Sequence, residues 1–100
     1  MNLLEVIEYR LRGKGFPSTI VVENDDNKIV YLRVLFVVQD TVIGLNIIDK
    51  DRYIEISFKD NETKTKVDMV DGVVDIDKIL LSCTELINNN LDKIIGEEVR

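Results

Sequence analysis

The spacing of hydrophobic positions along the chain changes twice, from a helical repeat to strand alternation and back again. In residues 2–12 the apolar side chains recur at helical spacing, which predicts an amphipathic helix. Gly13 is a stop signal for this helix, and Gly15 and Pro17 follow just beyond it. The apolar stripe consists of Leu3, Leu4, Ile7 and Leu11.

The middle of the chain contains five short β-branched or alternating runs, each bounded by turn-forming residues. They predict strands at 18–23, 28–39, 42–48, 53–58 and 63–70. The links at 24–27, 39–40, 49–51 and 60–62 are all shorter than the crossover of roughly a dozen residues that parallel strands need. We therefore expect an antiparallel meander whose strands lie in sequence order.

A second helical stripe follows the strands. It begins after Asp75 or Asp77, either of which suits an N-cap, and Asn88 to Asn90 interrupt it because asparagines form helices poorly. The interruption predicts a kink or a second short helix from Leu91. The stripe consists of Ile76, Ile79, Leu80, Cys83, Leu86, Ile87, Leu91 and Ile94. The predicted fold is a two-layer α+β domain spanning residues 1–100, with both helices on one face of the sheet.

The long second strand is apolar on both faces, which is unusual for a strand with one side in water. Its even-numbered positions from 30 to 38 are all apolar and are expected to face the helices. The opposite face forms a candidate interface of Ile29, Tyr31, Arg33, Leu35 and Val37, which Val42 and Ile48 of the next strand extend. Either the sheet curls or a helix segment covers this strip, or the strip binds a second molecule.

The two outer strands of the meander differ in how well they resist pairing with another chain. Lys64 and Lys66 place charges on the fifth strand, which discourages edge pairing. The first strand contains Ile20, Val21 and Val22 and has no such protection if it lies at the other edge.

The chain offers little catalytic or metal-binding chemistry. It has no His, so a Ser-His-Asp triad, a Cys-His pair and a structural zinc site are excluded, and we expect no enzyme activity and no cofactor. Cys83 lies on the helical stripe and is expected to be an inert core residue. The acids at 68, 71, 75 and 77 do not have the spacing of a calcium loop, and a structural role at the helix start is favoured.

The amino-acid composition excludes further classes of protein. Ile, Val and Leu make up 36 of the 100 residues, Ala is absent, and the net charge is −6. The acidic balance disfavours nucleic acid as a partner, and Arg10, Arg12 and Lys14 are too few to reverse it. No run approaches the roughly 20 apolar residues of a membrane span, and no secretory signal is visible, so we expect a cytoplasmic protein.

Three functional hypotheses follow from these patterns. The first is a non-catalytic protein-interaction or assembly module that forms a homodimer, or binds another protein, through the uncovered face of the sheet. The second is an acidic regulator or inhibitor that occupies a basic site of a nucleic-acid enzyme. The third is a small-ligand-binding protein with a pocket between the helices and the sheet.

Overall fold

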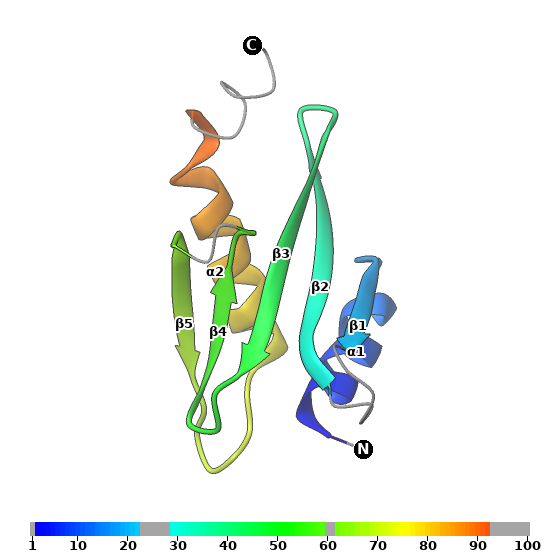
Figure 1. The fold of residues 1–100 in the computed structure, drawn as a ribbon, viewed down its shortest axis with the longest axis vertical. Helices are drawn as coiled ribbons and strands as arrows, with labels where there is room; N and C mark the ends of the chain where they lie inside the picture. Colours follow the sequence, from blue (N-terminus) through cyan, green and yellow to red (C-terminus); the bar gives the residue numbers. More distant parts are fainter. Residues whose placement is uncertain (1, 23–28, 60–61, 93–100) are drawn as a thin grey trace.

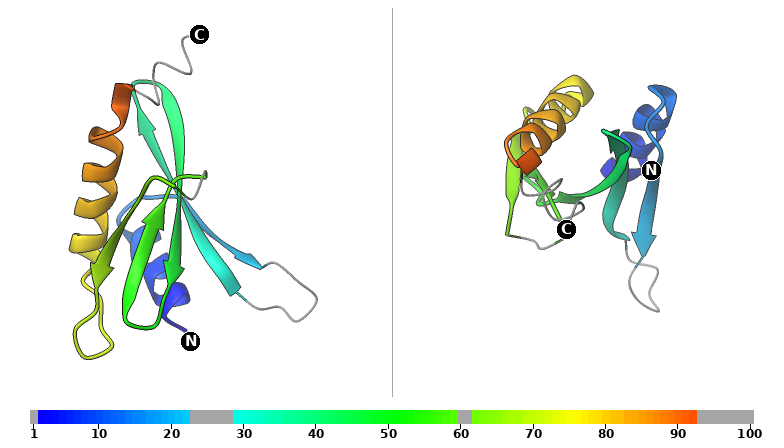
Figure 2. Two further views of the ribbon diagram at one scale, coloured as in Figure 1. Left: turned by 60° about the vertical axis from the view of Figure 1, so that its left-hand side comes forward. Right: turned by 90° about the horizontal axis from the view of Figure 1, so that it is seen from above.

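A computed structural model describes residues 2–22, 29–59 and 62–92 of the chain. The elements in order are α1 (Leu3–Gly13), β1 (Ser18–Val22), β2 (Ile29–Val38), β3 (Thr41–Asp49), β4 (Tyr53–Ser57), β5 (Lys64–Asp68) and α2 (Ile76–Asn88). The strands form one antiparallel sheet in the order β1-β2-β3-β4-β5, and both helices lie on the same side of it (Figures 1 and 2). The predicted two-layer α+β meander is confirmed.

Helix α1 begins with a capping box. The Asn2 side chain accepts a hydrogen bond from the Glu5 backbone N–H at 3.0 Å, and the Glu5 carboxylate accepts one from the Asn2 backbone N–H at 3.3 Å. The predicted range of 2–12 is therefore displaced by one residue, because Asn2 caps the helix and Gly13 still belongs to it. The chain leaves the helix at Gly15, whose φ of 91° suits a residue without a Cβ atom.

A tight turn at Gln39 and Asp40 joins β2 to β3. Both residues have positive φ, at 50° and 63°, which is the backbone of a type I′ hairpin turn. Val38 pairs with Thr41 across this turn, and the register continues down the ladder. This register turns the even positions of β2 and the odd positions of β3 towards the helices, as the sequence predicts.

One continuous hydrophobic core fills the space between the sheet and the helices. The fully buried aliphatic side chains come from α1, from the three central strands and from α2, so every layer contributes to the same cluster. These side chains are Ile7, Leu11, Leu32, Val34, Leu45, Ile47, Ile54, Ile56 and Ile79. Burial of branched aliphatic side chains of this size is the main stabilising term in the fold.

Polar contacts from α1 protect the free edge of β1. The Glu8 carboxylate accepts a hydrogen bond from the Ile20 backbone N–H at 3.1 Å. The Arg12 guanidinium donates two hydrogen bonds to the Ser18 carbonyl, at 3.1 Å from Nε and 2.9 Å from Nη2. β1 does lie at the edge and has no protecting charge of its own, but α1 supplies a partner to Ile20 that the strand pattern does not reveal.

Polar residues mark both ends of helix α2. Asp75 is the N-cap, since its carboxylate accepts a hydrogen bond from the Asp77 backbone N–H at 2.9 Å. The helix stops at Asn88, a turn follows, and the helical backbone resumes at Leu91. The Asn90 side chain donates to the Leu86 carbonyl at 2.8 Å, which confirms the predicted interruption. Ile94 and the predicted turn at 24–27 lie outside the described residues.

Replacing Glu8 with Ala tests how strongly α1 holds the edge of β1. The Glu8→Ala variant removes the acceptor of the Ile20 N–H, so we expect the free energy of unfolding to fall by about 1–2 kcal/mol. Urea denaturation followed by circular dichroism measures this change. Glu85→Ala, at an exposed position of α2, is the matched control and should change the free energy by less than about 0.5 kcal/mol. Equal losses of stability in the two variants would contradict the role of Glu8 in holding the edge of β1.

Candidate interaction surface

The face of the sheet that points away from α1 and α2 is called the uncovered face here. The right-hand view of Figure 2 shows α1 and α2 on the same side of the sheet, and neither helix crosses to the other side within the described residues. The ladder alternation assigns odd positions of β2 and even positions of β3 to this face. Six of the seven candidate interface residues lie on this face with side chains that the structure describes. The side chain of the seventh, Ile29, is not among the described ones.

The apolar candidates gather at the end of the β2–β3 hairpin. Val37 and Val42 pair directly across the two strands, and they are 72% and 63% exposed. Leu35 is 37% exposed and pairs with Gly44 across the two strands. We call residues 35–38 and 41–44 the hairpin end, and it extends past the last paired residues of β1 and β4 (Figure 1).

The other candidates, Tyr31, Arg33 and Ile48, are half-buried and lie further down the sheet. The Arg33 guanidinium carbon lies 5.7 Å from the centre of the Tyr31 ring, a cation–π distance. Arg33 Nε also donates a hydrogen bond to Asn46 Oδ1 at 3.3 Å. The candidate strip thus has an exposed apolar part at the hairpin end and a half-buried part that is mostly polar.

Two polar residues that sequence reasoning missed lie on the same face. Asn46 is 8% exposed and Ser57 is 0% exposed, although no described helix covers this side of the sheet. They occupy adjacent strands and pair with each other in the ladder. Asn46 is the only polar residue between Thr41 and Asp49, and that isolated polar position was the one signal in the sequence.

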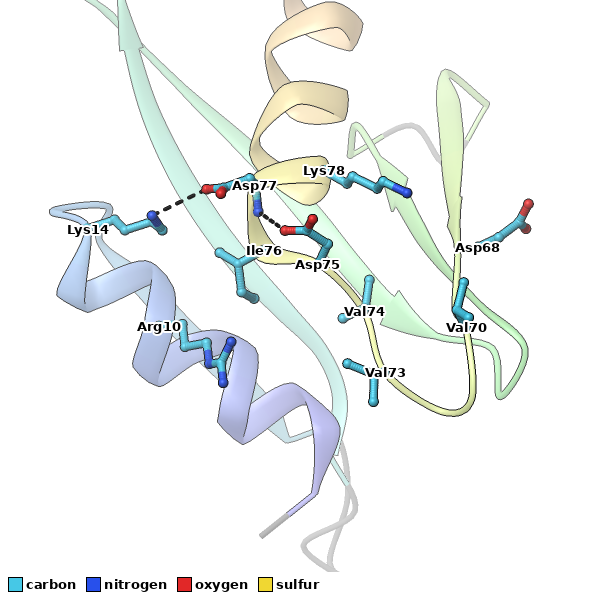
Figure 3. A pocket seen from close by; sticks show the side chains of 10 residues that line it. All are labelled: Arg10, Lys14, Asp68, Val70, Val73, Val74, Asp75, Ile76, Asp77 and Lys78. Atoms are coloured by element: carbon cyan, nitrogen blue, oxygen red, sulfur yellow. Dashed lines mark hydrogen bonds and ion pairs between the residues drawn. The ribbon is translucent and has the colours of Figure 1, made fainter.

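A pocket of about 580 Å³ opens between α1 and the N-terminal end of α2 (Figure 3). An ion pair of 3.3 Å between Lys14 and Asp77 bridges the two helices beside it, and Asp75 is already engaged as the helix cap. Three cations balance three carboxylates around the pocket, so its charge favours neither sign of ligand. The lining residues are Arg10, Lys14, Asp68, Val70, Val73, Val74, Asp75, Ile76, Asp77 and Lys78.

The described residues contain little reactive chemistry. No group of three or more His, Cys, Asp or Glu side chains in 2–22, 29–59 and 62–92 is placed to hold a metal ion. Cys83 is wholly buried in the core, and burial raises the pKa of its thiol to about 12. A thiol with so high a pKa is a poor nucleophile at neutral pH.

Together these features define an α+β protein with a five-stranded antiparallel sheet, one face of which is covered by neither described helix. Comparison with protein-family models, with curated proteins and with solved structures found no match. Within the described part of the chain, neither helix has the length and apolar character that crossing a membrane requires.

The raised pKa of Cys83 predicts a pH dependence of stability. In the unfolded chain the thiol loses its proton near pH 9, whereas in the folded protein it keeps the proton up to about pH 12. The folded state therefore binds more protons in this window and loses stability as the pH rises. Cys83→Ala removes the effect, so the stability difference between wild type and variant should change by about 1.4 kcal/mol per pH unit above pH 9. Urea denaturation at several pH values measures this difference in the free energy of unfolding. A difference that stays constant above pH 9 would contradict the burial of the Cys83 thiol.

Proposed function

We propose that this protein is a non-catalytic interaction module that forms a homodimer through the hairpin end of its uncovered face. The observation that carries the proposal is the exposed pair Val37 and Val42, with Leu35 beside it on the same face. Adjacent large apolar side chains exposed on one surface are typical of a site that another molecule covers.

The distribution of charge supports a second copy of the chain as the occupant. The chain has a net charge of −6 and 32% charged residues, so two copies repel each other over most of their surfaces. Residues 34–48, which include the hairpin end, contain a single charged side chain, Asp40 in the turn. The hairpin end is therefore the surface where two copies approach each other with the least electrostatic repulsion.

The backbone of the hairpin end supports the same occupant. Beyond Asn46, β3 has no strand beside it on the β4 side within the described residues, because the β3–β4 ladder ends at that position. Val42 and Gly44 form non-hydrogen-bonded pairs with β2, so their N–H and C=O groups point outwards from the hairpin. An edge of this kind can pair antiparallel with its own copy about a two-fold axis, which is the symmetry of most dimers.

The alternative of an acidic regulator has less support from the structure. Several acids have local structural tasks: Asp75 caps α2, Glu8 holds the edge of β1, and Glu5 completes the capping box. Others form ion pairs, such as Asp77 with Lys14 and Glu55 with Lys64. These acids are distributed over the fold and do not form one concentrated acidic surface.

Substitution of Val37 by Lys tests the homodimer. Val37→Lys places a charge where two copies would bury an apolar side chain, so we expect the dimer dissociation constant to rise more than about tenfold. Sedimentation equilibrium from low to high micromolar concentration measures that constant. Since Val37 is 72% exposed, the variant should keep the fold and the circular dichroism spectrum of the wild type.

Leu81→Lys is the matched control, because Leu81 is 58% exposed on α2 and lies outside the hairpin end. This variant should dimerise as the wild type does. A wild-type protein that stays monomeric at every concentration would refute the proposal, and so would a Leu81→Lys variant that dissociates as readily as Val37→Lys. Capture of a different protein by the hairpin end of a monomeric wild type would also refute the homodimer.

A further inference from the structure

A row of five polar residues, here called the polar row, crosses the uncovered face. Each strand contributes one member, and the ladder pairs each with the next. The members are Thr19, Arg33, Asn46, Ser57 and Lys64. Residues directly opposite each other in antiparallel strands project from the same face, so these side chains are neighbours.

The centre of the polar row is buried without being fully hydrogen-bonded. Ser57 is 0% exposed, and its hydroxyl has no hydrogen-bond partner among the residues that the structure describes. A buried hydroxyl without a partner lowers stability, and native proteins rarely retain one without a reason. The neighbouring Asn46 is nearly as buried. A ligand that meets these groups would remove the deficit.

The hydrogen-bonding groups of the row select the kind of ligand. Arg33 has several N–H donors, and one of them, Nε, is used on Asn46 Oδ1. That bond uses one of the two lone pairs of Asn46 Oδ1, and the NH₂ group of the same amide has two donors. The Ser57 hydroxyl adds another donor. The three central positions therefore present an excess of donors, which an acceptor-rich ligand complements.

The charge around the row favours a ligand that is negative. No carboxylate of the described residues lies within ion-pair distance of Arg33. On the same face Lys64 and Lys66 oppose two acids, the exposed Asp68 and the half-buried Glu55, which lies 3.7 Å from Lys64. These four charges cancel, so Arg33 supplies the local positive charge at the centre of this face, on a chain whose net charge is −6. An anion is drawn to this place and repelled by most of the remaining surface.

We propose that Arg33, Asn46 and Ser57 form a binding site for an oxyanion, the carboxylate or phosphate group of a small molecule. Because Arg33 Nε reaches Asn46, the guanidinium lies over β3, about 4.8 Å from the line of β4 that carries Ser57. Its Nη groups bind two oxygens of the anion, and the Asn46 amide donates to the same group. The Ser57 hydroxyl is fully buried, so it joins them only when the side chains that cover it move aside. This site is separate from the hairpin end, and the proposal does not depend on the homodimer.

Titration with inorganic phosphate and with acetate tests the site. Both probes are added to the full chain at constant ionic strength, with chloride as the balancing ion, and amide chemical shifts are followed by NMR. We expect saturable shifts centred on residues 33, 46 and 57. Tighter binding of phosphate identifies a phosphate ligand, and tighter binding of acetate identifies a carboxylate. Shifts that do not saturate, or that chloride alone reproduces, would overturn the proposal.

Two variants assign the binding to the named residues. Arg33→Gln removes the charge and should weaken binding of the preferred anion about tenfold. Ser57→Ala removes only a hydroxyl that has no partner within the described residues, so the fold loses no known hydrogen bond, and binding should weaken about fivefold. The second variant keeps the test valid if the first fails to fold.

Arg52→Gln is the matched control. Arg52 is an exposed cation beside the β3–β4 turn, so this change alters the net charge as Arg33→Gln does but leaves the polar row intact. Binding should stay within twofold of the wild type. If Arg52→Gln weakens binding as much as Arg33→Gln, the anion responds to overall charge and the site does not exist. Unchanged binding in Ser57→Ala would remove Ser57 from it and overturn the proposed geometry.

Discussion

The turn at Gln39 and Asp40 sets the register on which the rest of the sheet depends. Two residues with positive φ close the hairpin without splaying the strands, and Val38 must then face Thr41. A shift of one residue would move every side chain of the longest strand to the opposite face of the sheet. The core and the uncovered face are both consequences of that one turn, because β1 and β4 pair with the outer sides of the same hairpin.

The register divides the uncovered face into two parts with different physical character. At the hairpin end Val37 and Val42 are apolar, exposed and free of charge, which suits a dry contact between surfaces. One step down the ladder Arg33 leans over Gly44 towards Asn46, and the face becomes polar and half-buried. Gly44 lies where the two parts meet, and the side chains of Leu35 and Arg33 both lie next to it.

The sequence predicts the architecture well because the decisive signals are local. Links too short for crossovers imply a meander, and Asn88 to Asn90 mark the end of α2. The strand boundaries differ by only one or two residues from those expected. Fifth-strand pairing ends at Asp68, short of the expected residue 70, because the backbone turns at Asp71 and Gly72, which have positive φ.

The sequence predicts the surfaces less completely because they depend on residues far apart in the chain. Glu8 and Ile20 are twelve positions apart, and nothing in either segment shows that the carboxylate will accept from the strand. The burial of Ser57 depends on its neighbours across the ladder, whereas its own strand reads as a plain alternation. Likewise, the division of the candidate interface into an exposed apolar part and a half-buried polar part becomes visible only when the register places the strands side by side.

The contacts between α1 and β1 also limit how copies of this protein can assemble. Adding a strand beside β1 would require breaking the Glu8 and Arg12 contacts, and Lys64 and Lys66 oppose addition at β5. Strand addition is therefore hindered at Ser18 and Ile20 of β1 and along β5. The two-fold contact that we propose at the hairpin end would close after two copies and would give a finite complex, not a fibre.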